Sequence, residues 1–233
     1  MTAKNLKPAD YLKKILNARV YDVATESALE PAQNLSKRLN NTVLLKREDL
    51  QPVYSFKIRG AYNKLAHLTA EQLACGVVTA SAGNHAQGVA FACRHFGVQG
   101  TIFMPVTTPQ QKIDKTRAFG GDNVHIILTG DYFDQTLTAS QRFCTEEGAH
   151  FLSPFDDEDV IEGQSSVAVE LLDQLGRSPD LVILPVGGGG LSSGVTRYLR
   201  SESPGTEYRF VEPKGGASLT AALAAHEPVT LKR

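Results

Sequence analysis

The chain has 233 residues, of which 42% are hydrophobic and 21% charged, so it is long enough to bury a substantial core and we expect a globular protein. Its 24 basic and 25 acidic residues leave a net charge of −1, which argues against nucleic acid or an anionic membrane as a partner. The three cysteines show no metal-ligand spacing, no apolar run reaches the length of a membrane span, and residues 1–10 carry no secretory signal, so we expect a reduced cytoplasmic protein.

Helical and strand-like runs alternate along the chain, which predicts an α/β protein with a parallel sheet wrapped by helices. In chain order, the predicted elements are a helix at 9–17, a strand at 43–46, a helix at 56–68, a strand at 77–80, a helix at 86–96, a strand at 101–104, a helix at 109–119, a strand at 124–128, helices at 132–147 and 160–175, a strand at 181–185, a helix at 191–200 and a strand at 208–211. Glycine-containing turns follow two of these strands, at the sheet edge where open α/β proteins bind ligands.

The helix at 56–68 is preceded by Ser55 and contains Lys57 close to its start. Apolar residues follow at helical spacing, so Ser55 is the predicted N-cap and Lys57 lies in the first turn, at the positive end of the helix dipole. A cation is disfavoured there, so we expect the pKa of Lys57 to fall. With Phe56 beside it to exclude water, Lys57 is a candidate nucleophile for a Schiff base with an aldehyde cofactor. The alternative is a lysine that snorkels from a partly buried helix.

The turn at 81–88 joins a strand to a helix. It gathers successive backbone N–H groups, the Ser81 hydroxyl and the Asn84 amide around one concavity, which suits a carboxylate or another anion. An ordinary helix N-cap is the alternative.

Four consecutive glycines, Gly187 to Gly190, stand between the strand at 181–185 and a helix. Without Cβ atoms, such a loop can fold its amides round a phosphate, and the helix adds its positive end. The run matches neither the dinucleotide spacing, because Ser192 or Ser193 occupies the position of the last glycine, nor a nucleotide-triphosphate loop, because lysine is missing. It favours a cofactor with a single phosphate, with a flexible connection as the alternative.

An activated lysine, an anion turn and a monophosphate loop together are what pyridoxal phosphate requires. The chain resembles the fold type II pyridoxal-phosphate enzymes, the class of the tryptophan synthase β subunit, and within them the threonine deaminases, over residues 11–229. The most specific segments are 46–62, 81–89 and 185–191. Cysteine and threonine synthases usually carry an acid where this chain has Ile58 or Arg59, so they are less similar.

The resemblance implies two open, twisted parallel-sheet domains with the cofactor in the cleft between them. The smaller domain would be 51–153, and the larger, cofactor-binding domain would combine 1–50 with 154–233. In this family the larger domain continues past the position of Arg233, so we expect it to be incomplete here. The usual glycine-glutamine-glycine-threonine is replaced by residues 163–166, preceded by Glu162, which is expected to strain packing near the cleft.

The resemblance also implies roles for individual residues. Lys57 would hold pyridoxal phosphate as a Schiff base and later remove the substrate Cα proton. The implied cofactor-binding residues are Lys57, Phe56, Asn84, Gly187, Gly188, Gly189, Gly190 and Leu191. The implied substrate-carboxylate residues are Ser81, Ala82, Gly83, Asn84 and His85. The reaction would be β-elimination of water from L-threonine to 2-oxobutanoate and ammonia, the first step of isoleucine biosynthesis, with L-serine giving pyruvate, and we expect a homo-oligomer.

Two alternatives remain open at the level of sequence. Serine racemases have similar lysine and asparagine segments, but the positions of their magnesium ligands hold Glu212, Gly216 and Ser218 here, and losing the last carboxylate weakens a hard-cation site. No histidine cluster suggests zinc, so no metal is expected. The other alternative is a truncated homologue that binds the cofactor poorly or acts only with a complete partner.

Overall fold

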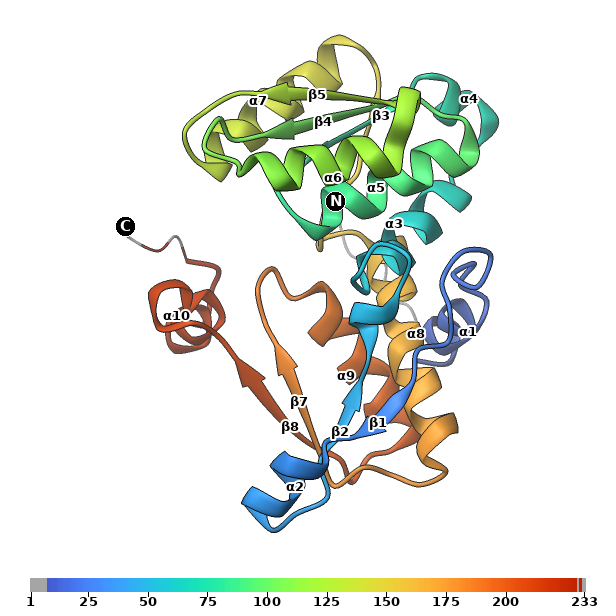
Figure 1. The fold of residues 1–233 in the computed structure, drawn as a ribbon, viewed down its shortest axis with the longest axis vertical. Coiled ribbons are helices and arrows are strands. Elements are labelled where there is room, and N and C mark those ends of the chain that lie inside the picture. The colour runs from blue at the N-terminus through green and yellow to red at the C-terminus, as the bar shows by residue number, and fades with distance from the viewer. Residues whose placement is uncertain (1–7, 230, 232–233) are drawn as a thin grey trace.

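The computed structural model describes residues 8–229 and 231, which form two lobes (Figure 1). The sequence predicts no secretory signal at residues 1–10, and residues 1–7 of that segment lie outside the described residues. The strands are β1 (Leu29–Pro31), β2 (Leu44–Lys46), β3 (Val77–Ala80), β4 (Gly100–Met104), β5 (Val124–Leu128), β6 (His150–Phe151), β7 (Leu181–Pro185) and β8 (Glu207–Val211). The α-helices are α1 (Pro8–Leu16), α2 (Gln33–Leu39), α3 (Lys57–Ala66), α4 (Ala70–Ala74), α5 (Asn84–Phe96), α6 (Gln110–Gly120), α7 (Phe133–Glu146), α8 (Glu158–Leu175), α9 (Gly190–Glu202) and α10 (Ser218–Ala225).

One lobe is built on a four-stranded parallel sheet with the order β5-β4-β3-β6. Alternate residues of β4 point to opposite faces, as the strand period requires. Ile102 and Met104 pack with α5 and α6, whereas Phe103 packs with α7 and with Val78 of β3. Because helices cover both faces, the inner strand β3 is buried along its whole length. This explains why it is apolar except for Thr79, whose hydroxyl donates to the Leu152 carbonyl oxygen.

The other lobe contains the parallel pair β7 and β8, with Leu181 opposite Glu207. Val182 and Leu184 of β7 are buried against α1, α8 and α9, while Ile183 on the opposite face is 62% exposed. The strand predicted at 43–46 does not join a parallel sheet. It pairs antiparallel with β1, a strand of three residues that ends in Pro31 and has no sequence pattern of its own.

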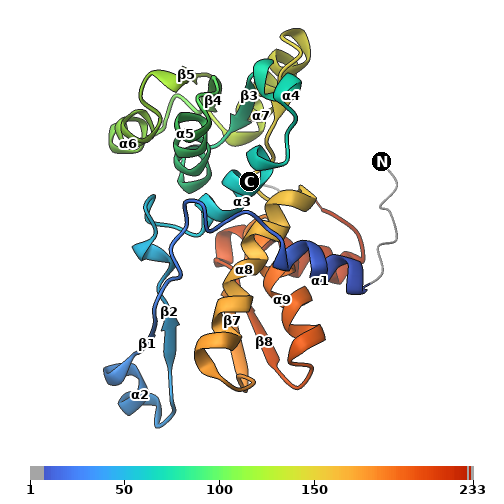
Figure 2. The same ribbon diagram turned by 90° about the vertical axis from the view of Figure 1, so that its right-hand side faces the viewer.

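The lobes meet where α3 packs against both α5 and α8, and the turned view shows α3 between the two lobes (Figure 2). Gly163 permits this contact, because a Cβ there would lie 2.7 Å from the Arg59 carbonyl oxygen. The Ser166 hydroxyl beside it donates to the Gly163 carbonyl, and the buried Glu162 accepts from Lys14 on α1. Glu162 and Ser166, which depart from the family pattern, therefore have hydrogen-bond partners, on α1 and within α8 respectively.

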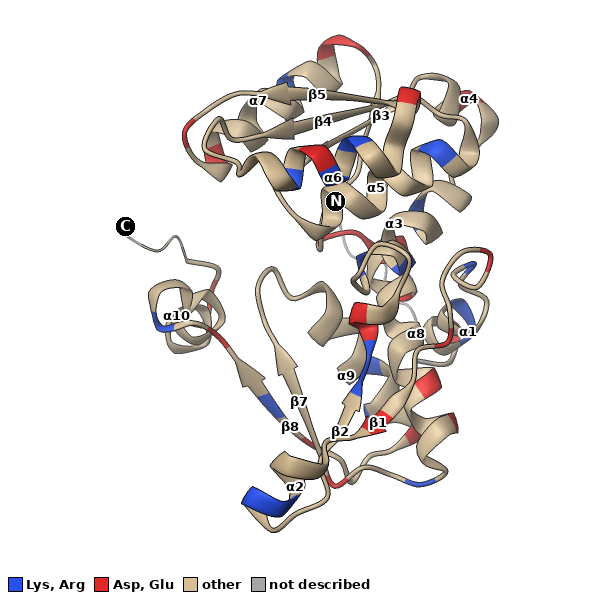
Figure 3. Cartoon of the chain, in the orientation of Figure 1, with Lys and Arg blue, Asp and Glu red and all other residues tan. Residues whose placement is uncertain are grey.

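We propose domain boundaries at 50/51 and 153/154, because the four-stranded sheet lies within 51–153 and the β7–β8 pair within 154–233. Basic and acidic residues are interspersed over both lobes (Figure 3). In the described part of the chain, none of the helices combines the length and the apolar character needed to cross a membrane.

Candidate active site

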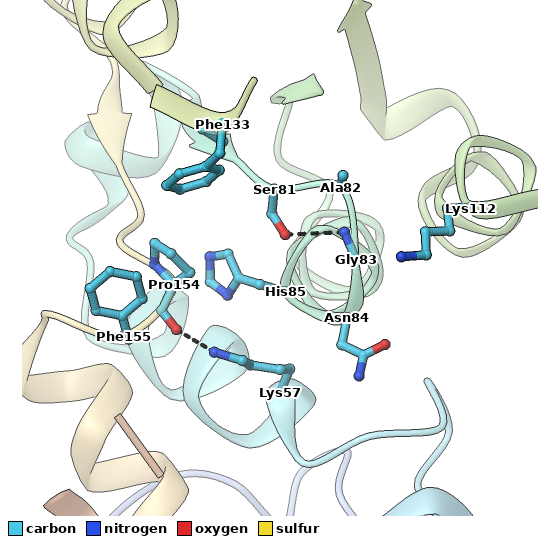
Figure 4. Close-up of a pocket in the computed structure, with 11 residues that line it drawn as sticks. Lys57, Ser81, Ala82, Gly83, Asn84, His85, Lys112, Phe133, Pro154 and Phe155 are labelled. Atoms are coloured by element: carbon cyan, nitrogen blue, oxygen red, sulfur yellow. Dashed lines mark hydrogen bonds between the residues drawn. The ribbon is translucent and has the colours of Figure 1, made fainter. Parts of the chain in front are cut away.

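A cavity of about 360 Å³ opens at the carboxyl edge of the four-stranded sheet (Figure 4). This is the edge where the sequence pattern predicted ligand binding. The residues that line the cavity are Lys57, Ala80, Ser81, Ala82, Gly83, Asn84, His85, Lys112, Phe133, Pro154 and Phe155. The cavity thus brings together the predicted lysine and all five residues predicted to hold the substrate carboxylate.

Lys57 is the first residue of α3, which confirms its predicted place in the first turn. The prediction that Ser55 caps this helix is wrong. Phe56 occupies the N-cap position with helical backbone angles, no side chain caps the helix, and the buried Ser55 hydroxyl has no partner among the described residues. Because the chain is already helical at Phe56, the Ser55 hydroxyl is not presented to the amides of the first turn.

Burial lowers the pKa of Lys57 to about 8 from an ordinary 10.5. The predicted direction is correct, but the cause is desolvation rather than the helix dipole. Its Nζ donates to the Pro154 carbonyl oxygen at 2.5 Å and lies 5.4 Å from the centre of the Phe56 ring. A carbonyl stabilises an ammonium less than a carboxylate does, and with a pKa of about 8 roughly a tenth of the amine is neutral at pH 7 and available as a nucleophile.

The turn at 81–85 leads directly into α5. The Ser81 hydroxyl accepts from the Gly83 amide at 3.3 Å, and no side chain caps the helix, which removes the ordinary N-cap alternative. The amides of Asn84 and His85 donate to no other described residue, so they are available to an anion.

His85 is buried in the cavity wall, with Nε2 3.4 Å from the Leu152 carbonyl oxygen and Nδ1 without a described partner. Burial, and then the nearby charge of Lys57, lower the pKa of His85 to about 3. Its imidazole is therefore neutral at physiological pH.

The glycine loop, Gly187 to Gly190, stands at the start of α9, with Gly189 in the left-handed region at φ +88°. The amides from Gly187 to Ser192 donate to no other described residue, which leaves a run of N–H groups at a positive helix end. These groups fit the phosphate of pyridoxal phosphate, and Lys57 fits its aldehyde, so the donor set of this chain is compatible with that cofactor.

The glycine loop does not line the cavity. Phe155 separates them, because it faces the cavity and a Cβ on Gly188 would lie 2.2 Å from its ring. Phe56 and Leu191, both predicted to bind the cofactor, pack against the apolar core of the lobe that contains α8 and α9, and their contact with a cofactor stays a prediction.

Sequence reasoning missed three polar or aromatic cavity residues, Lys112, Phe133 and Phe155. It also missed Pro154, whose carbonyl oxygen accepts from Lys57. Lys112 and Phe133 lie in the first turns of α6 and α7, the helices that follow β4 and β5. Applying the carboxyl-edge rule to every predicted strand, rather than only to the glycine-containing turns, would have found both.

Glu212, which stands at a magnesium-ligand position of the serine racemases, binds backbone amides in this structure. The Glu212 carboxylate accepts from the amides of Leu219 at 2.7 Å and Thr220 at 2.9 Å, at the start of α10. No group of three or more potential histidine, cysteine or acidic ligands occurs within the described part of the chain.

The family model for pyridoxal-phosphate dependent enzymes matches residues 20–233. The chain belongs to this family. A curated relative is the biosynthetic L-threonine dehydratase IlvA of Burkholderia multivorans, which is 50% identical over 222 residues, or 95% of this chain and 44% of that protein. The chain spans about half the length of the curated relatives it matches.

Solved structures of the family agree with the predicted fold type II architecture. Processed threonine deaminase isoform 2 from Solanum lycopersicum is 45% identical, with a TM-score of 0.92 over 99% of this chain and 66% of that one. Maize serine racemase is 32% identical, with a TM-score of 0.88 over 95% of this chain and 66% of that one. The deaminase is the more similar of the two, in the order that the sequence predicted.

Proposed function

We propose that this protein is a pyridoxal-phosphate-dependent threonine ammonia-lyase, which eliminates water from L-threonine to give 2-oxobutanoate and ammonia. The observation that carries the proposal is a buried lysine with a lowered pKa that shares a cavity with an anion-binding turn. The relatives named threonine dehydratase and threonine deaminase support the same activity. By extension, L-serine would give pyruvate, and the pathway served would be isoleucine biosynthesis.

Each group of residues has a part in this proposal. When pyridoxal phosphate is bound, Lys57 would hold its aldehyde group, and the Lys57 amine would remove the substrate Cα proton. The turn at 81–85 would hold the substrate carboxylate, Asn84 would hydrogen-bond the cofactor ring hydroxyl, and the glycine-loop amides would bind the phosphate. When bound, pyridoxal phosphate supplies the electron sink that makes the Cα proton acidic.

Three observations limit how other residues take part. His85 stays neutral, so it does not act as the acid that protonates the departing hydroxyl. Phe133 and Phe155 give the cavity an apolar wall that can contact the threonine methyl group. The cavity contains no aspartate or glutamate among its described lining residues, which leaves Lys57 as the base.

A second candidate rests on length. Because the chain spans about half of its curated relatives, it could bind cofactor without turnover, or act only with a partner chain. Racemisation of serine is a weaker candidate, since the racemase structure is less similar. A homo-oligomer and a cytoplasmic location remain part of the proposal.

The test is the absorbance spectrum of the purified protein incubated with pyridoxal phosphate, followed by borohydride reduction and peptide mass spectrometry. We expect a band near the violet edge and a covalent adduct at Lys57, both lost in Lys57→Ala and kept in the control Lys115→Ala. Threonine should then yield 2-oxobutanoate. The band without product would favour the binding-only candidate, and an adduct at another lysine would refute the assignment.

A further inference from the structure

The cavity is lined by positive groups and by the starts of several helices. Of the helices described, α3, α5, α6 and α7 all begin at its rim, so their positive ends point toward the same space. The lining residues include two lysines, Lys57 and Lys112, and none of them is acidic. Such a cavity favours an anionic ligand more strongly than the turn at 81–85 would alone.

Lys112 is the lysine to which the proposed reaction gives no role. It is the third residue of α6, and its ammonium is directed toward the turn that holds Gly83 and Asn84 (Figure 4). It forms no salt bridge or side-chain hydrogen bond with any described residue, although the nearby Asp114 pairs with Gln110 and Arg117. The positive end of the helix dipole disfavours a cation in the first turn. No described acidic side chain pairs with Lys112 to offset this repulsion, and a bound anion would do so.

We propose that Lys112 binds the α-carboxylate of the substrate together with the turn at 81–85, and so makes a free carboxylate a requirement for binding. This inference rests on the proposed amino-acid substrate. An ammonium on a flexible stem with three donors can reach an oxygen that the backbone amides leave exposed. The interaction is present in the ground state and the transition state alike, so it contributes to binding rather than to the chemical step.

The kinetic test compares Lys112→Gln with the wild type, both incubated with pyridoxal phosphate. Loss of one charge-assisted hydrogen bond at a partly solvated site should raise KM for threonine and for serine about tenfold, with kcat unchanged. The wild-type KM should rise with ionic strength and the variant KM should do so less. Lys112→Arg should recover most of the lost affinity, and threoninamide should be insensitive to the substitution.

A matched control is Lys115→Gln, which changes a lysine about one turn further along α6. Lys115 lies over the Tyr54 ring, 5.5 Å from its centre, and does not line the cavity. The Lys115→Gln substitution also removes one positive charge from α6. If the KM of this variant equals that of the wild type, the effect of Lys112→Gln comes from direct contact and not from a general loss of positive charge.

A binding measurement tests the inference without turnover. 3-Hydroxybutanoate is threonine without its amino group, so it cannot react with the cofactor but retains the carboxylate. In a ligand-observed NMR titration, we expect the wild type to bind it about tenfold more tightly than Lys112→Gln. Equal affinities, equal KM values, or no binding by the wild type would overturn the inference. Absence of 2-oxobutanoate from wild-type reactions would refute the proposed function instead, and the titration would still decide the role of Lys112.

Discussion

Lys57 illustrates how a reactive side chain costs a protein stability. Its amine is largely buried, and the group it contacts is the neutral Pro154 carbonyl. Removing a charge from water without an opposite charge is unfavourable, and the protein responds by lowering the pKa. The same burial that makes the amine nucleophilic therefore disfavours the folded state at neutral pH.

We predict that Lys57→Met stabilises the cofactor-free protein at pH 7. The folded pKa is about 8 and the unfolded value is 10.5, so between these values the unfolded chain binds more protons and stability rises with pH. Below about pH 8 the full penalty is present. The variant should gain about 3 kcal/mol at pH 7, the free-energy equivalent of lowering the pKa from 10.5 to about 8, and the gain should shrink toward pH 10.5.

Urea unfolding at a series of pH values measures this gain. Lys37→Met, at an exposed position on α2, is the control and should change stability little at any pH. A gain that grew with pH would contradict the burial explanation.

At the scale of elements, the contact between α3 and α8 contains a buried ionic network. Arg59 of α3 is fully buried and donates to Glu170 at 2.5 Å, to Glu48 at 2.8 Å and to the Ser166 hydroxyl at 3.0 Å. Lys46 of β2 also donates to Glu170 at 2.6 Å. The network therefore links β2, α3 and α8. Arg59 follows Lys57 by two residues, so the network also fixes the start of α3 against the other lobe.

We predict that Arg59→Met destabilises the protein by about 3–5 kcal/mol, because it leaves two carboxylates without their main partner. Glu170 is only 2% exposed and cannot recover hydration. Chemical denaturation measures the loss. Arg142→Ala, which breaks an exposed pair with Glu146 on α7, is the control and should have no measurable effect. A loss as small as that of the control would show that the network contributes little.

The elements also show what the sequence could predict. The apolar strands at 77–80, 124–128 and 181–185 were predicted to the residue, because their composition and flanking turns are distinctive. β6 has two residues and is defined only by pairing with β3, α2 has no buried residue, and α10 is apolar without a clear helical face, so none of the three has a periodic signal.

The candidate site divides in the same way. Lys57 and the turn at 81–85 lie in segments of unusual local composition, and the sequence identified them. Lys112 and Phe133 have ordinary neighbours, and only the parallel pairing of β3, β4 and β5 brings them to one cavity. The separation of the glycine loop from the cavity by Phe155 depends on tertiary packing, which no local pattern encodes.

At the scale of the whole molecule, the groups that fit the cofactor are divided between the two lobes. Lys57 and the turn at 81–85 lie on the side of the four-stranded sheet, whereas the glycine loop follows β7 of the other lobe. A molecule that contacts both sets at once would link the lobes in addition to α3 and α8. The phosphate and the aldehyde of one ligand should then bind more tightly together than as separate molecules.

We predict that pyridoxal phosphate raises the free energy of unfolding more than pyridoxal and inorganic phosphate do together. At a concentration one hundred times its dissociation constant, a ligand that binds only the folded state contributes about 2.7 kcal/mol. Thermal unfolding with each ligand separately, with both fragments together, and with pyridoxal phosphate measures the difference. In Lys57→Ala the effect of pyridoxal should disappear while that of phosphate remains, because the glycine-loop amides are unchanged. Equal stabilisation by pyridoxal and pyridoxal phosphate would show that the glycine loop does not bind the phosphate.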